Sequence, residues 1–209
     1  MRSLLLVCSC VIPCAGVELV RRDFGLALEA LPVAFDYTLS TPGGDISGSD
    51  EFERALGLRL GGRWSFSSPG ATGAAMAGLD LRLGDAVYAD NGSYRTAGVG
   101  LSLGYARNLG RRWTLYIEPL VEFGWATLDF DATTAAPAIS ADGTHLVYGA
   151  RLGGLYALSP RWLIDAQFGW VDIVSDTDAD RGSFELDQSG LMAGLGVVWR
   201  FSAAPARLE

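Results

Sequence analysis

Nine charged residues alternate with apolar residues in segments that are otherwise rich in leucine, aromatic residues and glycine. Five are carboxylates and four are arginines: Glu29, Arg59, Asp80, Arg82, Glu118, Glu122, Arg151, Asp165 and Arg200. In a β-strand this alternation places the charges on one face and the apolar residues on the other. Buried charges are tolerated only when they are paired and hydrogen-bonded. We therefore predict an ion-pair network that fills an enclosed interior, with a small-solute or ion channel as the alternative.

A second candidate is the acidic segment Asp176-Thr-Asp-Ala-Asp-Arg-Gly182, which resembles the start of a calcium-binding loop. Its weak metal-ligand candidates are Asp176, Asp178 and Asp180, because alternate carboxylates are the oxygen ligands that Ca²⁺ prefers. The glycine comes one place late, and no flanking helices are expected. A polar loop tip is the favoured interpretation. Similar acidic residues in other expected loops indicate solvated surface or, as the alternative, bridging to lipopolysaccharide through divalent cations.

His145 is the single histidine of the chain. A hydrolytic dyad or triad needs a base beside a nucleophile. Small membrane barrels that deacylate lipid A place a serine two residues after the histidine, where this chain has Val147. The sequence therefore predicts no enzyme and no cofactor, and a lipid A-modifying enzyme is the less favoured alternative. We interpret His145 as an interface residue at the start of a strand.

Eight segments with a period of two must position these residues. They run over Phe24–Leu39, Ala55–Phe66, Ala74–Val87, Tyr94–Ala106, Arg112–Leu128, His145–Ala157, Trp162–Ile173 and Leu186–Phe201. Eight amphipathic strands with no helix to cover them predict an all-β fold, an eight-stranded antiparallel up-and-down transmembrane β-barrel. A soluble barrel with its leucines turned inward, such as a lipocalin, is the alternative.

The connections between these segments alternate in length. Long ones are expected at Ser40–Arg54, Tyr88–Ser93, Asp129–Thr144 and Val174–Glu185, and short ones at Ser67–Gly73, Arg107–Arg111 and Leu158–Arg161. Outer-membrane barrels place short turns on the periplasmic side and long loops outside. An even number of strands then puts both termini in the periplasm.

Aromatic residues gather near the ends of the predicted strands, on the face that also carries the leucines. The expected aromatic girdle consists of Trp64, Phe66, Tyr105, Trp113, Trp125, Tyr156, Trp162, Trp170, Trp199 and Phe201. Amphipathic rings favour the interface between membrane and water. Two prolines interrupt the pattern: we predict a bulge at Pro32, where the first segment changes parity, and another at Pro119.

The N-terminus predicts export. Residues 1–16 have a charged start, an apolar stretch and a small-residue cleavage site, as in a secretory signal peptide, with lipidation at Cys10 or Cys14 as the alternative. Residues 17–201 would form the barrel and residues 202–209 a short tail. All three cysteines lie in the signal, so disulfides and thiolate metal sites are not expected. The net charge of −8 without a basic stripe argues against nucleic acid.

The chain resembles the eight-stranded outer-membrane barrels of the OmpA/OmpX type and the outer-membrane β-barrel domain proteins of Gram-negative bacteria. The resemblance rests on Tyr116-Ile-Glu-Pro-Leu-Val-Glu-Phe-Gly-Trp125 and on Gly194-Leu-Gly-Val-Val-Trp-Arg-Phe201. It implies an integral protein of the outer membrane with a structural or surface-interaction role. The implied partners are outer-membrane lipid, lipopolysaccharide and, during insertion, the barrel-assembly machinery that reads a C-terminal aromatic strand. We expect a monomer.

Overall fold

The computed structural model describes residues 17–68, 70–88, 92–131, 138–179 and 182–203. Ten strands make up its regular structure: β1 (Glu18–Ala30), β2 (Ala34–Thr41), β3 (Gly44–Glu51), β4 (Arg54–Ser67), β5 (Gly73–Tyr88), β6 (Gly92–Leu109), β7 (Trp113–Phe130), β8 (Ile139–Ala157), β9 (Trp162–Ala179) and β10 (Gly182–Ala203). No helix in these ranges is long and apolar enough to cross a membrane.

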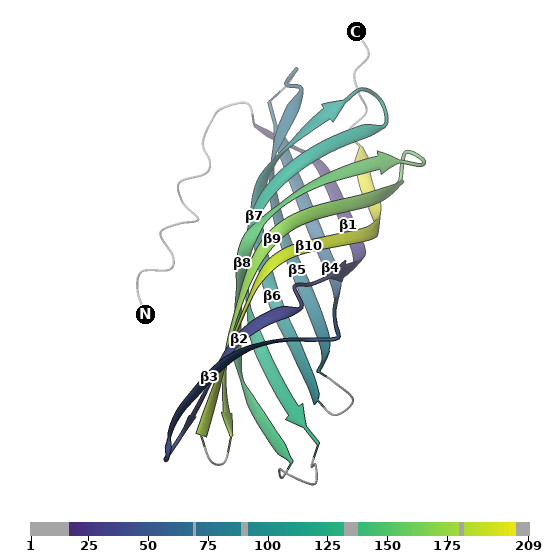
Figure 1. The fold of residues 1–209 in the computed structure, drawn as a ribbon. Helices are drawn as coiled ribbons and strands as arrows, with labels where there is room; N and C mark the ends of the chain where they lie inside the picture. The colour runs from purple at the N-terminus through teal and green to yellow at the C-terminus, as the bar shows by residue number, and fades with distance from the viewer. Residues whose placement is uncertain (1–16, 69, 89–91, 132–137, 180–181, 204–209) are drawn as a thin grey trace.

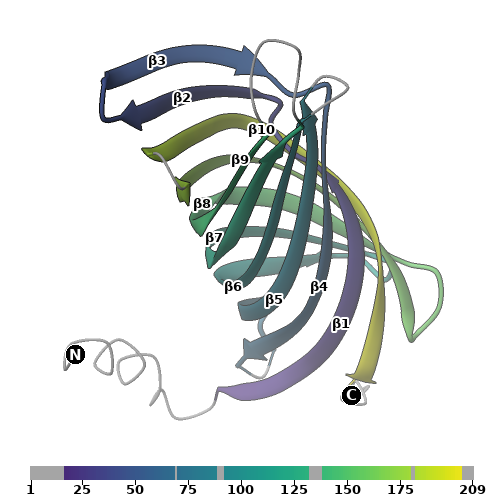
Figure 2. The same ribbon diagram turned by 90° about the horizontal axis from the view of Figure 1, so that it is seen from below.

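Eight of the ten strands form a closed ring. The order runs β1-β4-β5-β6-β7-β8-β9-β10, and β10 pairs back onto β1. Every pairing is antiparallel, and neighbours along the chain are neighbours in space from β4 to β10. Figures 1 and 2 show the tilted strands curving around one axis. The predicted eight-stranded up-and-down barrel is confirmed.

The two faces of the wall are as the alternation predicts. On β4, Leu58 is 39% exposed, whereas its neighbour Arg59 is 4% exposed. Leu81 beside Arg82 on β5 shows the same contrast. The leucine-rich face therefore points away from the barrel axis and the charged face points into the lumen, which excludes the soluble alternative with its leucines inside.

The predicted bulge at Pro32 is wrong, because the strand ends there. β1 stops at Ala30, and after Leu31–Val33 the chain starts a new strand, β2, which pairs with β10 and β3. Proline has no N–H to donate to a ladder. The Pro32 carbonyl instead accepts a hydrogen bond from Gln188 Nε2 at 2.9 Å. The β2–β3 hairpin thus leaves the ring and extends beyond it, as Figure 2 shows.

The predicted bulge at Pro119 is also wrong. The pairing of β7 with β8 continues through Pro119 without a shift of register. The pairing of β7 with β6 is interrupted at Glu118 and Pro119, but the register is the same before and after the interruption. The shifts of register lie instead in β1, between Leu19 and Arg21 and between Arg22 and Asp23.

Three of the expected long connections are largely strand. β3 occupies most of Ser40–Arg54, β7 and β8 continue into Asp129–Thr144, and β9 and β10 continue into Val174–Glu185. These extensions alternate serine, threonine and aspartate instead of leucine, so apolar periodicity alone did not detect them. The predicted signal at 1–16 lies outside the described residues, as does most of the predicted tail, since β10 continues to Ala203.

Candidate functional site

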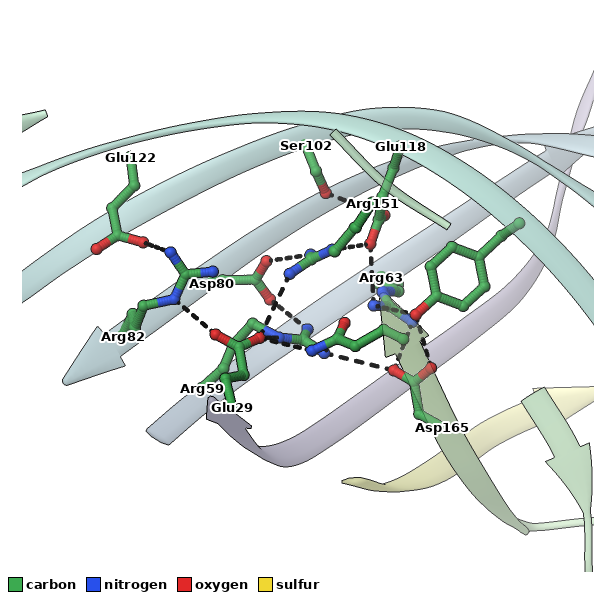
Figure 3. A network of polar contacts seen from close by, with 12 residues as sticks. Glu29, Arg59, Arg63, Asp80, Arg82, Ser102, Glu118, Glu122, Arg151 and Asp165 are labelled. Carbon is green, nitrogen blue, oxygen red and sulfur yellow. Dashed lines mark hydrogen bonds and ion pairs between the residues drawn. The ribbon is translucent and has the colours of Figure 1, made fainter. Parts of the chain in front are cut away.

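The middle of the lumen holds a polar network drawn in Figure 3. Seven of the eight ring strands contribute side chains to it. The eighth, β10, has Gly194 beside the network, where a Cβ would lie 2.4 Å from Gln167 Nε2. Eight of the nine charged residues named from the sequence belong to it: Glu29, Arg59, Asp80, Arg82, Glu118, Glu122, Arg151 and Asp165. All eight are at least 94% buried.

Glu29 is the hub at one side of the network. Its carboxylate accepts a hydrogen bond from Arg59 Nε at 2.8 Å and another from Arg82 Nε at 2.8 Å. Gln167 Nε2 donates a third at 2.6 Å, and Arg151 Nη1 lies 3.7 Å away. A carboxylate with this many donors has its desolvation cost offset by charge-assisted hydrogen bonds.

Arg63 and Arg151 hold the opposite side together. Arg151 Nε donates to Glu118 at 2.5 Å, and its Nη2 donates to Asp80 at 2.9 Å. Arg63 bonds Glu118 at 3.0 Å and Asp165 at 3.1 Å, while its guanidinium lies 4.5 Å from the centre of the Tyr116 ring. The charges are therefore interlocked across the lumen.

His145 joins the network at Glu122. Its Nε2 lies 3.0 Å from a Glu122 oxygen, and its Nδ1 lies 3.0 Å from the Trp125 carbonyl. A carbonyl oxygen only accepts, so Nδ1 donates to Trp125. Glu122 also pairs with Arg82 Nη1 at 2.8 Å. The central network thus contains five carboxylates, four arginines and this histidine.

Arg200, the ninth predicted member, lies elsewhere. Its Nε donates to Asp23 at 3.2 Å, and Arg21 Nε contacts the other oxygen of the same carboxylate at 2.7 Å. This pair of arginines around one aspartate lies at the end of the barrel where β1 begins and β10 ends. Among the described residues it has no ion pair with the central network.

Sequence reasoning missed several members that parity could have found. Arg63 was not named among the inward charges, although it shares odd parity with Arg59 on β4. Gln167 shares parity with Asp165, and Tyr116 with Glu118. The interpretation of His145 as an interface residue is wrong, because the residue is 1% exposed and points into the lumen.

Apolar layers close the lumen on both sides of the network. Toward the short connections lies a buried cluster of Met76, Ala106, Tyr116, Leu155, Leu163 and Val198. Toward the long connections lies a larger cluster of Phe35, Phe52, Ala55, Ala86, Tyr94, Ala126, Leu128, Ala141 and Leu186. The Phe52 ring packs at a tilt against Phe35, with ring centres 4.4 Å apart, and stacks on Tyr94, with ring centres 5.7 Å apart. Two cavities beside the network measure about 20 and 10 Å³, room for about one water molecule each.

The aromatic residues expected as a girdle are not distributed evenly between the two barrel ends. Eight of them lie near the short-connection end: Trp64, Phe66, Tyr105, Trp113, Tyr156, Trp162, Trp199 and Phe201. Trp162 meets Trp199 edge to face with ring centres 4.5 Å apart. Trp125 lies toward the other end, and Trp170 is mid-strand because β9 continues to Ala179.

The candidate calcium segment is not a loop. Asp176 and Asp178 are exposed on β9, and Asp180 lies outside the described residues. An extended strand separates alternate carboxylates along one face instead of wrapping them around an ion. In the described part of the chain, no three histidine, cysteine or carboxylate side chains gather as a metal site would require.

The strand extension beyond the lumen has an acidic outer face. Three pairs of exposed carboxylates lie directly opposite each other on neighbouring strands: Asp142 and Asp178, Asp176 and Glu185, Asp187 and Asp36. Like charges at such positions oppose strand pairing. A groove of about 480 Å³ lies on this face across β10, β2 and β3, between Asp36, Thr38, Ser47, Ser49, Glu185 and Asp187.

One polar contact ties the hairpin to the opposite rim. The Tyr88 hydroxyl on β5 donates a hydrogen bond to the exposed Asp50 carboxylate on β3. This bond, together with one from the Glu51 backbone N–H, holds the pKa of Asp50 below its ordinary value. The same bond raises the pKa of Tyr88.

A family model described as outer membrane protein beta-barrel domain matches residues 22–201. The chain belongs to this family. Its members are proteins of the Gram-negative outer membrane, so the leucine-rich outer face of the ring meets lipid and the strands of the ring are transmembrane strands. No curated protein sequence matches the chain.

Solved structures share the architecture at low sequence identity. OprG from Pseudomonas aeruginosa is 13% identical with a TM-score of 0.53, and the match covers 90% of this chain and 99% of that one. Ail, the attachment invasion locus protein of Yersinia pestis, is 15% identical with a TM-score of 0.46 over 88% and 100%. The outer membrane protease OmpT from Escherichia coli is 9% identical with a TM-score of 0.49 over 90% and 99%. These identities show the fold alone.

Proposed function

We propose that this protein is a closed, non-conducting outer-membrane barrel that holds its acidic strand extension at the cell surface for contact with other molecules. The observation that carries the proposal is the filling of the lumen. An ion-pair network lies between two apolar layers, with cavities of about 20 and 10 Å³ beside it.

This filling disfavours the channel alternative. A hydrated ion would have to separate Arg151 from Glu118 and Asp80, and then pass between the Phe35 and Phe52 rings. Removing one partner of a buried ion pair costs about 3–5 kcal/mol. A channel through this lumen would meet a free-energy cost of this kind each time it opened.

The position of the single histidine disfavours a lipid A-modifying enzyme. His145 is 1% exposed and bonds Glu122 inside the lumen, whereas lipid chains lie against the opposite face of the wall. A base for acyl transfer must reach its substrate within hydrogen-bond distance. We therefore place no catalytic role on it.

Planar-bilayer recording of the purified full chain tests the closed lumen. The expected result is no steady conductance above that of protein-free bilayers, with a porin of known conductance in the same membranes as the positive control. A reproducible step conductance that scales with salt would overturn the proposal in favour of the channel.

A pair of cysteine variants tests which end faces outward. Ser47→Cys lies on the hairpin, and Ser68→Cys lies in the connection after β4 at the opposite end. With the extension outside and both termini periplasmic, a membrane-impermeant maleimide labels Ser47→Cys on intact cells and labels Ser68→Cys only after the outer membrane is permeabilised. The reverse pattern would contradict surface display.

A further inference from the structure

The β2–β3 hairpin ends the sheet with an unpaired edge. The strand order stops at β3, and no other strand of the described ranges pairs with its outer side. Every residue of β3 except Gly48 is exposed. Edge strands present a row of unpaired backbone groups, which proteins commonly blunt with proline, lysine or a bulge. β3 has none of these devices in its Ser47-Gly48-Ser49 centre.

The register shows which groups point outward. Phe52 N donates to the Val33 carbonyl at 2.9 Å, which makes this directly opposite pair a hydrogen-bonded one. Hydrogen-bonded and non-hydrogen-bonded pairs alternate along an antiparallel ladder. Ile46, Gly48 and Asp50 therefore turn their N–H and C=O groups toward β2. Asp45, Ser47 and Ser49 turn theirs toward solvent.

Charge around this edge selects the occupant. β2, β3 and Gly182–Gln188 of β10 carry the exposed carboxylates Asp36, Asp45, Asp50, Glu51, Glu185 and Asp187 and neither lysine nor arginine. A second copy of β3 would bring acids against acids, which is unfavourable for cross-strand neighbours. A segment with arginine or lysine would gain attraction from the same groups.

We propose that β3 accepts an extended cationic segment of another protein as an added strand. The proposal deepens the surface-contact function and rests on it. The partner's backbone bonds Asp45, Ser47 and Ser49, its basic side chains lie toward the acidic groove, and an apolar side chain can lie beside Ile46, which is 57% exposed. Main-chain bonds of this kind give affinity, and alternate side chains give specificity.

The probe is a blocked peptide as long as β3, with arginine at both ends and threonine and valine alternating between them. Hydrogen exchange by NMR on the full chain in detergent micelles is the readout. Free protein should show slow Ile46 and Gly48 amides and fast Ser47 and Ser49 amides. Adding peptide should slow Ser47 and Ser49 at least about tenfold. A version with glutamate at both ends should bind about tenfold more weakly, since each tenfold corresponds to about 1.4 kcal/mol.

Backbone variants separate strand addition from plain charge attraction. Ser47→Pro removes an outward N–H that β2 does not use, and edge positions tolerate proline. Ser47→Ala keeps the N–H and is the matched control. Binding should be lost in Ser47→Pro and kept in Ser47→Ala, while Ile46 and Gly48 stay protected in both. N-methylation of the peptide's β3-facing amides should abolish binding to the unaltered protein.

Equal binding of the N-methylated peptide, or of the arginine and glutamate peptides, would overturn the inference. So would saturating peptide that leaves Ser47 and Ser49 exchange unchanged. These outcomes are independent of the bilayer and labelling results, so the strand-addition inference can fail while a closed, surface-displayed barrel stands.

Discussion

Carboxylates occupy two regions of this molecule under opposite conditions. In the lumen, Glu29, Asp80 and Glu118 are almost fully buried, and each meets at least two arginines. On the strand extension, Asp36, Asp176 and Asp142 are exposed and each lies opposite another carboxylate. The comparison teaches that each of these interior carboxylates is matched by arginines, whereas each of these exterior carboxylates faces another carboxylate on a neighbouring strand. In the proposed function, the interior charges fill the lumen and the exterior charges are available to a partner.

The largest expected effect comes from breaking one interior pair. Arg151→Met removes one of the two guanidinium groups that Glu118 and Asp80 each contact. Unfolding in urea with lipid or detergent present should show a loss of about 3–5 kcal/mol. The matched exterior change is Arg54→Met, which removes the exposed contact to Asp85 at 3.5 Å. Surface pairs contribute about 0–1 kcal/mol. Equal losses in the two variants would erase the proposed distinction between the regions.

The next effect concerns the layer between the two regions. Phe52→Ala removes a 3%-exposed ring that packs on Phe35 and Tyr94, and should destabilise the mouth by about 3 kcal/mol. Amide exchange should accelerate across β2 and β3 and remain slow in β5 to β9. Ile46→Ala, which truncates an exposed side chain of the same hairpin, is the control. Unchanged hairpin exchange in Phe52→Ala would show that the ring does not hold the extension.

A smaller effect is expected at His145. Its ring nitrogens lie 3.0 Å from Glu122 and 3.0 Å from the Trp125 carbonyl, and hydrogen bonds to charged groups are worth about 1.5–3 kcal/mol. His145→Gln should therefore destabilise the protein by about 2 kcal/mol in the same urea unfolding measurement. Unchanged stability in His145→Gln would show that these two contacts do not hold the network together at this point.

The smallest effect is a pH response of the hairpin tether. The hydrogen bond from Tyr88 lowers the pKa of Asp50 in the folded protein. The stabilisation that this bond gives the hairpin is therefore fully present above the ordinary aspartate pKa of about 3.9, and it is lost as the pH falls through the lowered value. Hairpin amide exchange measured between about pH 5 and pH 2 should show a step that Tyr88→Phe abolishes. If Tyr88→Phe showed a step of equal size, the pH dependence of hairpin exchange would come from other carboxylates.

Most of the ring could be predicted from the sequence because its lipid-facing side repeats large apolar residues every second position. Leu58, Leu81 and Leu101 identify the outer face of the barrel wall, and the residues between them must then face the lumen. Parity likewise identified eight of the network residues. Arg63 and His145 lie near the ends of the predicted segments Ala55–Phe66 and His145–Ala157, where alternation is a weaker guide to which side of the wall a residue faces.

The extension could not be predicted in the same way. β3 and the outer parts of β8, β9 and β10 lie in water on both faces or carry serine, threonine and aspartate outside, so no apolar period marks them. The break between β1 and β2 around Pro32 depends on the pairing of β2 with β10, which joins distant parts of the chain. Arg200 lies near the end of β10, opposite Asp23 of β1, and alternation shows only that it faces inward, not how far along the barrel it lies.

β10 is a strand with two partners on one edge: its Ala193–Ala203 portion pairs with β1, and its Ser183–Gln188 portion pairs with β2. Arg22, near the beginning of the ring, meets Ser202, near its end. Closure of the ring and attachment of the hairpin to it therefore both require β10 to be in place. A substitution that displaces β10 should loosen the seam and the hairpin together.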